Sequence, residues 1–238
     1  MRNVLITGGS RGIGAAMVRL FAEKGYRVAF TYKNSDAAAR ALSEETGALA
    51  IKADNASQQD ILTAVRKAEE NIGSIEILIN NAAVSHFGLV TDMTLETWRD
   101  VFSINLDAAF LYCKHLLPSM INNRFGRIIN ISSMWGAVGA SCEVCYSSSK
   151  AALIGFTKAL AKEVGPSQVT VNAIAPGVID TEMNAALSDS DKEALEDQTP
   201  LTRMGSASEV AECALFLASD GASYITGDVM NVSGGFVV

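Results

Sequence analysis

Histidine and cysteine are scarce in this sequence of 238 residues, which holds two histidines and four cysteines. Cys142 and Cys145 form a C-x-x-C pair, a spacing found in redox dithiols and in zinc sites. No second C-x-x-C and no paired histidines complement it, so we expect no metal site. We interpret the cysteines as reduced thiols, with a functional dithiol at Cys142 and Cys145 as the alternative.

Long apolar runs and an excess of positive charge are also missing. No apolar run approaches the roughly 18 residues that a membrane span requires, so we expect no membrane partner. The first glycine turn begins at Gly8 and leaves no room for a cleaved signal peptide, which favours a cytoplasmic location. A net charge of −7 and a pI near 4.9 argue against a nucleic-acid partner.

Hydrophobic residues make up 49% of the chain, enough for one sizeable core. Short runs rich in Val and Ile alternate with longer amphipathic stretches, without a linker or repeat. This alternation predicts an α/β fold with a doubly wound parallel sheet, as one domain over residues 1–238. The predicted strands are NVLIT, RVAFTY, ALAIKA, IEILINN, RIINIS, VTVNAIA and residues 228–232, and the predicted helices span residues 12–24, 36–46, 58–72, 95–121, 147–164 and 207–218.

Four of the predicted strands run directly into small or polar residues. The segments concerned are TGGSRGIG, NNAA, NISS and NAIAPG. In open parallel sheets, ligands bind beyond the carboxyl ends of the strands. Any one of these segments is explained by a tight turn, but four together predict a ligand cleft lined with glycines, amides and hydroxyls.

The first of these segments, ITGGSRGIG, has the composition of a phosphate-binding turn. Gly8, Gly12 and Gly14 permit positive φ and let backbone N–H groups approach a pyrophosphate. The helix N-terminus that follows adds partial positive charge. The spacing is G-x-x-x-G-x-G rather than the commoner G-x-G-x-x-G, but its place between the first strand and the first helix predicts dinucleotide binding.

The end of the second predicted strand indicates which dinucleotide binds. An acidic residue there accepts a hydrogen bond from the ribose 2′-hydroxyl of NAD, but TYKN holds no carboxylate before Asp36, which we expect to begin the next helix. Arg11 and Lys33 are placed to neutralise a 2′-phosphate, so we predict NADP(H), with ordinary surface cations as the alternative. Asp54, after the third strand, is placed to reach the adenine.

The stretch CYSSSK sets Tyr146 and Lys150 four positions apart, on one face of a helix. A free tyrosine has a pKa near 10, and a neighbouring ammonium lowers that pKa by favouring the phenolate. Carbonyl reduction needs such a proton donor, because the alkoxide formed by hydride attack must be protonated. Ser133 is placed to hydrogen-bond the same carbonyl oxygen. A chance Tyr-x-x-x-Lys on a solvated helix is the alternative.

Taken in order, these motifs resemble the short-chain dehydrogenase/reductase family, over nearly the whole chain. Within that family, GRIINISS, GFTKALAKEV, VTVNAIAPGVIDTEM and FLASDGASYITGDVMNVSGG are most similar to the NADP-dependent 3-oxoacyl-acyl-carrier-protein reductases of fatty-acid synthesis. The resemblance implies a Rossmann-like sheet of about seven strands with helices on both faces. It also implies a homotetramer, with the helices over 95–121 and 147–164 at one subunit interface.

The resemblance further implies roles for individual residues. In a tetrad, Tyr146 donates the proton, Lys150 lowers its pKa and holds the nicotinamide ribose, Ser133 positions the carbonyl, and Asn105 holds a water that links Lys150 to solvent. The implied cofactor-binding residues are Gly8, Ser10, Arg11, Gly12, Ile13, Gly14, Lys33, Asp54, Asn55, Asn81, Ala82, Ala83, Tyr146, Lys150, Pro176, Gly177, Ile179 and Thr181.

The implied reaction is the NADPH-dependent reduction of a 3-oxoacyl thioester, either a small molecule or bound to an acyl carrier protein. Three departures from the family pattern bear on the substrate. Ala83 replaces a glycine, and Met134 and Trp135 stand where smaller side chains are usual. Ser167 replaces one of two carrier-docking arginines, of which Arg124 matches the other. Reduction of a steroid, sugar or small cyclic ketone therefore stays open, as does a non-catalytic NADP-binding sensor.

The acidic segment over residues 183–203 is expected to be a substrate lid, with a solvated helix pair as the alternative.

Overall fold

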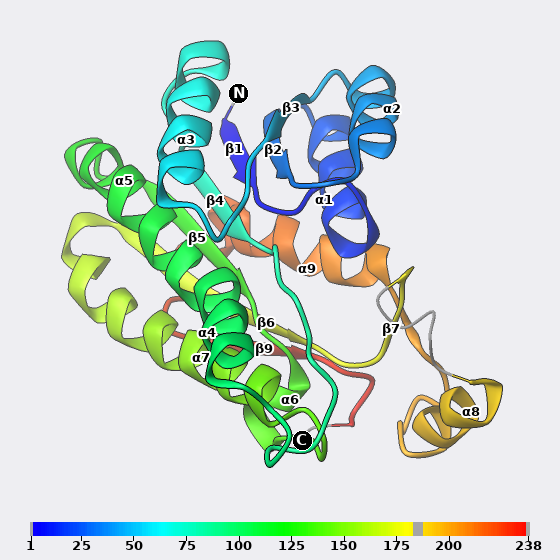
Figure 1. Ribbon diagram of the computed structural model, residues 1–238. Helices are drawn as coiled ribbons and strands as arrows, with labels where there is room; N and C mark the ends of the chain where they lie inside the picture. Colours follow the sequence, from blue (N-terminus) through cyan, green and yellow to red (C-terminus); the bar gives the residue numbers. More distant parts are fainter. Residues whose placement is uncertain (1, 183–187, 237–238) are drawn as a thin grey trace.

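The computed structural model describes residues 2–182 and 188–236 as alternating strands and helices (Figure 1). The strands of the main sheet are β1 (Asn3–Ile6), β2 (Arg27–Tyr32), β3 (Leu49–Lys52), β4 (Ile77–Asn80), β5 (Gly126–Ile131), β6 (Val169–Pro176) and β9 (Val229–Val232). The helices are α1 (Gly12–Glu23), α2 (Asp36–Thr46), α3 (Gln58–Ile72), α4 (Leu95–Phe102), the π-helix η1 (Ser103–Asp107), α5 (Ala108–Asn122), α6 (Met134–Val138), α7 (Val144–Val164), α8 (Asp189–Asp197) and α9 (Ala207–Ala218). All seven strands of the main sheet fall within two residues of the predicted ranges.

The seven strands pair in the order β3-β2-β1-β4-β5-β6-β9, and every pair is parallel. The winding direction reverses between β1 and β4, which makes the sheet doubly wound and opens a crevice beyond the carboxyl ends of these two strands. This topology is Rossmann-like and confirms the predicted fold class.

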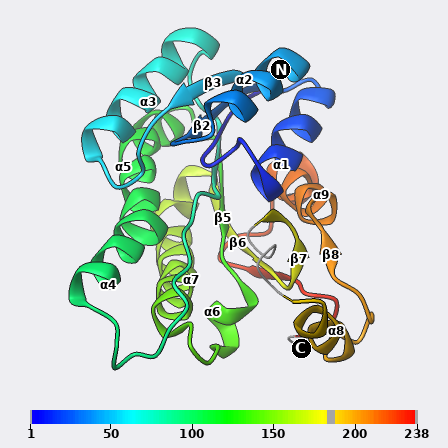
Figure 2. The ribbon, with the colours of Figure 1, turned by 45° about the vertical axis from the view of Figure 1, so that its right-hand side comes forward.

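Two layers of helices bury the two faces of the sheet, as the views in Figures 1 and 2 show. Helices α1, α2 and α9 cover one face, and α3, α5 and α7 cover the other. Successive residues of β1 divide between the two cores: Val4 and Ile6 pack with Phe21 of α1, whereas Leu5 packs with Leu116 of α5. Alternation along the strand explains this division, and burial on both faces explains the continuous apolar run.

The predicted helix over residues 95–121 is wrong in one respect, because it is not a regular α-helix throughout. Residues Ser103–Asp107 form the π-helix η1 between α4 and α5, with Asn105 at its centre. The helix predicted over 147–164 begins earlier, at Val144. Helix α6 and the small parallel pair β7 (Ile179–Asp180) and β8 (Gly205–Ser206) were not predicted.

Within the predicted lid, α8 begins at Asp189 behind a capping box in which the Ser188 hydroxyl accepts from the Asp191 N–H. Residues 183–187 of that segment lie outside the described residues. In Figure 1, α8 lies apart from the layered body of the molecule, beyond β7. None of the described helices is long and apolar enough to cross a membrane.

Candidate active site

The exits of β1 and β4 are joined by hydrogen bonds at the crevice. The Thr7 hydroxyl oxygen accepts from the backbone N–H groups of Asn81 and Ala82, both at 3.0 Å. In return, Asn81 Nδ2 donates to the carbonyl oxygens of Thr7 at 2.9 Å and Gly8 at 3.1 Å. The Asn81 side chain, predicted to lie against the cofactor, therefore holds the glycine turn in place, with Ala82 and Ala83 directly behind it.

The glycine turn has the shape that a pyrophosphate requires. Gly8 and Gly12 have φ values of +65° and +52°, which favour glycine. A Cβ on Gly14 would lie 2.1 Å from the Gly8 carbonyl oxygen, so a side chain has no room there. Within the described part of the chain, no side chain caps the start of α1, so the N–H groups of Gly12 and Ile13, behind Ser10 and Arg11, fit an anion.

The adenosine end of the crevice is rich in ion pairs. Lys33, after β2, lies 2.7 Å from Asp54, after β3. The Asp36 carboxylate, which does begin α2 as predicted, accepts from Lys52 at 2.9 Å and from the Tyr32 hydroxyl at 3.3 Å.

Asn55 and Arg11, two further residues predicted to bind the cofactor, have different surroundings. Asn55 is buried, and its side-chain oxygen accepts from the Tyr112 hydroxyl at 3.3 Å. Arg11 is exposed and forms no ion pair with any described residue.

The segment after β6 closes the other end of the crevice. The Gly177 N–H donates to the Val232 carbonyl oxygen at 2.9 Å, and a Cβ on Gly177 would lie 2.7 Å from Ser233. A Cβ on Gly12 would lie 3.5 Å from Thr181, so the glycine turn lies directly against the end of the predicted nicotinamide segment, Pro176 to Thr181.

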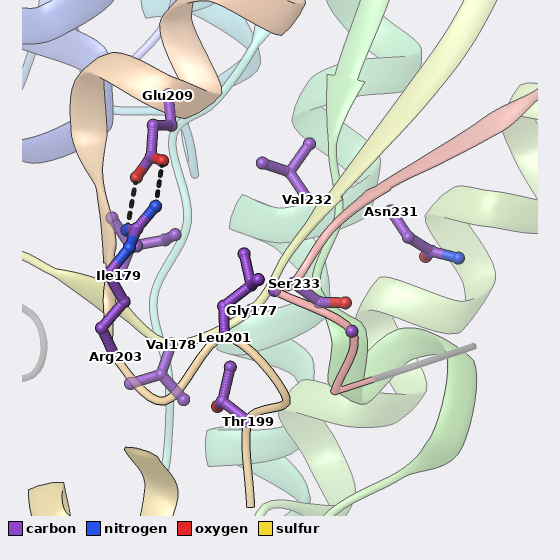
Figure 3. Close-up of a pocket in the computed structure, with 13 residues that line it drawn as sticks. Gly177, Val178, Ile179, Thr199, Leu201, Arg203, Glu209, Asn231, Val232 and Ser233 are labelled. Atoms are coloured by element: carbon purple, nitrogen blue, oxygen red, sulfur yellow. Dashed lines mark hydrogen bonds and ion pairs between the residues drawn. The ribbon is translucent and has the colours of Figure 1, made fainter.

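A cavity of about 350 Å³ lies behind this segment, as Figure 3 shows. Aliphatic side chains of Val178, Leu201 and Val232 line it, and one wall is the ion pair of Arg203 with Glu209, whose atoms lie 2.6 Å apart.

Tyr146 and Lys150 lie together on the buried face of α7, next to Ser133 at the end of β5. The Lys150 ammonium nitrogen is 5.7 Å from the centroid of the Tyr146 ring, and the Ser133 side chain is close enough to the Tyr146 hydroxyl to influence its pKa. The Ser133 oxygen also accepts from the Trp135 N–H at 3.2 Å, which starts α6. Lys150 is 2% exposed and donates to the Ile131 carbonyl oxygen at 2.7 Å.

The predicted lowering of the Tyr146 pKa is not found in this structure. Burial raises the pKa of Tyr146 to about 12, against a smaller opposing effect of the neighbouring Ser133 side chain. Burial also lowers the pKa of Lys150 to about 7, because its nearest partner is a carbonyl oxygen rather than a carboxylate. Desolvation therefore outweighs the attraction between the two groups, and the phenol is held in its protonated form.

Asn105 connects this cluster to the loop after β4. Its amide oxygen accepts from the Val84 N–H, and its Nδ2 donates to the Val84 carbonyl oxygen, both at 2.9 Å. Nδ2 also donates to the Ser149 hydroxyl at 2.9 Å, and Ser149 in turn donates to the Tyr146 carbonyl oxygen. The side chain thus bonds to the residue preceding Lys150 rather than to Lys150 itself.

Two residues of this site were missed by sequence reasoning, although each had a signal. Thr7 is the threonine of the TGG turn, and its hydroxyl oxygen accepts two backbone hydrogen bonds from the residues that follow β4. Ser149 is a fully buried serine inside CYSSSK. Its hydroxyl accepts a hydrogen bond from Asn105 and donates one to the Tyr146 carbonyl oxygen.

Trp135 and the cysteines also have defined places. The Trp135 ring is half-buried and packs edge-on against Phe236, with ring centroids 5.4 Å apart, so it lies at the surface of α6 rather than in the core.

Cys142 and Cys145 are both free thiols that form no disulfide, and burial raises the pKa of Cys145. Among the described residues, no group of three or more His, Cys, Asp or Glu side chains is arranged to hold a metal ion.

A doubly wound parallel sheet, a glycine turn at its switch point and a Ser-Tyr-Lys cluster at a neighbouring strand exit define a nucleotide-dependent oxidoreductase fold. The family model described as Enoyl-(Acyl carrier protein) reductase matches residues 8–237. The chain belongs to the short-chain dehydrogenase/reductase family.

Several known proteins are similar in sequence to this chain over nearly their whole length. The chain is 42% identical to the 3-oxoacyl-(acyl-carrier-protein) reductase of Chlamydia trachomatis, covering 98% of this chain and 96% of that protein. It is 41% identical to the acetoacetyl-CoA reductase of Rhizobium meliloti, covering 98% of each chain. A blue fluorescent protein from a metagenomic library, solved in complex with NADPH, is 36% identical with a TM-score of 0.94 and covers 100% of this chain and 98% of its own.

Proposed function

We propose that this protein uses NADPH to reduce the ketone of a 3-oxoacyl thioester to a secondary alcohol. The observation that carries the proposal is the buried Tyr146 side chain, which lies next to Ser133 and beside Lys150. The names of the relatives support the substrate: 3-oxoacyl-(acyl-carrier-protein) reductase in Chlamydia trachomatis and Aquifex aeolicus, and acetoacetyl-CoA reductase in Rhizobium meliloti.

In the proposed mechanism, NADPH when bound supplies the hydride to the ketone carbon. The Ser133 hydroxyl donates a hydrogen bond to the ketone oxygen and orients it. The Tyr146 hydroxyl donates its proton to the same oxygen, and its high pKa keeps that proton available at neutral pH. Lys150, when protonated, stabilises the phenolate that remains and holds the nicotinamide ribose. Asn105 fixes the loop at Val84 and holds a water that returns a proton from solvent.

We propose NADP(H) rather than NAD(H) as the cofactor. The first carboxylate after β2, Asp36, is engaged by Lys52 and Tyr32, so it is not placed to accept from a ribose 2′-hydroxyl. The exposed guanidinium of Arg11 suits a 2′-phosphate. The solved protein from a metagenomic library, which is in complex with NADPH, supports this choice.

An apolar rim near the cleft supports an acyl substrate rather than a sugar. The loop after β4, which Asn105 anchors, exposes Phe87 at 77% and Leu89 at 58%, and Val138 of α6 is 59% exposed. The Gly88 N–H donates to the Cys142 carbonyl oxygen at 2.8 Å, so this loop lies against the segment that connects α6 to α7. Apolar side chains exposed around a cleft mark a surface that buries apolar ligand area.

The proposal also includes the molecule that carries the acyl group. Arg124 is exposed, with its guanidinium donating to the Pro166 carbonyl oxygen at 3.3 Å, and Ser167 contributes no charge beside it. We propose that an acidic acyl carrier protein docks here through Arg124, with less electrostatic support than two arginines would give.

Three more expectations from the sequence remain proposals. We place the protein in the cytoplasm as a homotetramer, with α4, α5 and α7 at one subunit interface. Leu95 at 61% exposure and Phe110 at 49% give these helices an apolar outer face that an interface would cover. We also propose that the chain forms one domain in which the segment around α8 acts as a lid over the cleft.

A small cyclic ketone is the second candidate substrate. The half-buried ring of Trp135, which packs edge-on against Phe236, favours it as a flat wall for such a ligand. The test follows NADPH absorbance with acetoacetyl-CoA, an acetoacetyl carrier protein and a panel of cyclic ketones. We expect turnover with the thioesters, whereas turnover of a cyclic ketone alone would replace the proposal.

Trp135→Ala should alter the KM for the preferred substrate, with Trp98→Phe, on α4, as the aromatic control. Tight NADPH binding without turnover of any substrate would instead indicate a sensor.

A further inference from the structure

Lys33 and Asp54 form an ion pair at the adenosine end of the cleft. The two residues follow β2 and β3, which are neighbours in the sheet with Tyr32 paired to Lys52, so they leave the sheet side by side. Their charged atoms lie 2.7 Å apart, and the side chains are 53% and 32% exposed. The lysine expected to meet a 2′-phosphate therefore already has a carboxylate partner in its own chain.

Asp54 is the fixed member of this pair. One of its carboxylate oxygens accepts from the Ala56 N–H at 3.0 Å, and its own N–H donates to the Asp60 carboxylate at 3.0 Å. Burial acts to raise the pKa of Asp54, but hydrogen bonds from Lys33 and the Ala56 N–H lower it overall, so the carboxylate is charged at neutral pH. Lys33 has a longer and more exposed side chain, and it is the partner that moves when the pair breaks.

Arg11 differs from Lys33 because it is exposed at the start of α1 and pairs with no carboxylate of the described residues. The neighbouring cation Lys52 is held by both oxygens of Asp36, at 2.9 Å and 3.0 Å. At this end of the cleft, Lys33 and Lys52 are therefore each held by a carboxylate, whereas Arg11 forms no ion pair with a described residue.

We propose that Asp54 limits the preference for NADP(H) over NAD(H), because by pairing with Lys33 it withholds that cation from the ribose 2′-phosphate. This inference rests on the proposed function, since it requires that the cleft binds NADP(H). A 2′-phosphate must either displace Asp54 from Lys33 or accept the nearby negative charge, and both weaken its binding. The preference that remains comes mainly from Arg11.

The test is the ratio of the dissociation constants for NAD⁺ and NADP⁺, measured by titration calorimetry on wild type and Asp54→Asn. The two nucleotides differ only in the 2′-phosphate, and the measurement needs no turnover. Asp54→Asn keeps the shape of the side chain and removes its charge. We expect it to raise the preference for NADP⁺ roughly 3- to 5-fold, in the range of an exposed ion pair. An unchanged or smaller preference would overturn the inference.

Two further variants show whether the effect is specific to this pair. Glu45→Gln removes a carboxylate that pairs with Arg19 at 2.8 Å, outside the cleft residues, and should leave the ratio at its wild-type value. In a Lys33→Met background, Asp54→Asn should lose most of its effect, because no ammonium is left to release. An equal gain in that background, or the same gain from Glu45→Gln, would contradict the role of the pair.

The proposed cofactor and this inference fail in different ways. A wild-type protein that binds NADP⁺ no better than NAD⁺ overturns the choice of NADP(H) and this inference with it. A wild-type preference for NADP⁺ that Asp54→Asn leaves unchanged overturns the role of Asp54 alone.

Discussion

The Lys150 ammonium lies 5.7 Å from the centre of the Tyr146 ring, while its hydrogen bond, 2.7 Å long, goes to the Ile131 carbonyl oxygen. Both side chains are buried, and burial favours the neutral form of each. The pKa of Tyr146 therefore rises to about 12 and the pKa of Lys150 falls to about 7. The phenol is therefore an acid with its proton in place, next to a lysine that titrates near neutral pH.

The buried Lys150 should make stability depend on pH. Burial lowers its pKa from 10.5 to about 7, so between these values the unfolded chain binds the extra proton and stability rises with pH. The same contribution is lost as pH falls through about 7. We expect the unfolding free energy of wild type, relative to Lys150→Met, to increase by at least about 1 kcal/mol from about pH 7 to 9. Urea unfolding of the protein without dinucleotide measures this difference.

The control for that experiment is Lys158→Met, which removes an exposed lysine from the same helix. Its difference from wild type should stay constant over the same pH range. A constant difference for Lys150→Met as well would show that Lys150 is not titrating in a buried site.

Gly14→Ala should weaken dinucleotide binding. Its Cβ would lie 2.1 Å from the Gly8 carbonyl oxygen, so either the turn or α1 has to move. We expect a loss of stability of about 1–3 kcal/mol and at least a tenfold weaker affinity for NADP⁺, measured by calorimetry on the folded fraction. Gly155→Ala is the matched control, since its Cβ meets no atom within 4 Å in the part of the chain that the structure describes. Equal NADP⁺ affinity in the two variants would mean that the glycine turn does not bind the pyrophosphate.

Asn105→Ala should destabilise the protein more than an exposed asparagine does. It removes both hydrogen bonds to Val84 and the one to the buried Ser149 hydroxyl, which together cost about 1–3 kcal/mol. Asn71→Ala, which loses one exposed bond to the Lys67 carbonyl oxygen, should cost less than about 0.5 kcal/mol. Urea unfolding compares the two, and equal losses would rule out Asn105 as the anchor of this loop.

The sheet and its exits were predictable because burial on both faces leaves a strong signal. Continuous Val and Ile runs such as "ILIN" of β4 mark strands of a parallel sheet, and the polar residues after them mark the crevice. The cluster of Ser133, Tyr146 and Lys150 followed from the spacing of CYSSSK and the exit of β5.

Other features depend on contacts that spacing does not encode. The π-helix at Ser103–Asp107 accompanies the bonds from Asn105 to Val84 and Ser149, which are far from it in sequence. The direction of the Tyr146 pKa shift depends on burial and on the Lys150 ammonium pointing at a carbonyl oxygen. Likewise, the pairing of Lys33 with Asp54 depends on the order of β2 and β3 in the sheet.

The proposed tetramer predicts a mass of four times 25.1 kDa by light scattering. Gly155 lies on the exposed side of α7, and a Cβ added there meets no atom of the described residues within 4 Å. Gly155→Arg should therefore be harmless to a monomer but should break an interface formed by α7, lowering the measured mass. A wild-type mass of 25.1 kDa, or a variant that stays tetrameric, would contradict the proposed interface.

Tyr146→Phe removes the proposed proton donor and little else, because the ring and its packing are kept. The most direct measurement is NADPH consumption with acetoacetyl-CoA, alongside NADPH affinity from calorimetry. We expect turnover to fall at least about 100-fold while the affinity for NADPH stays close to wild type. Turnover near the wild-type rate, with NADPH still bound, would contradict the assignment of Tyr146 as the acid.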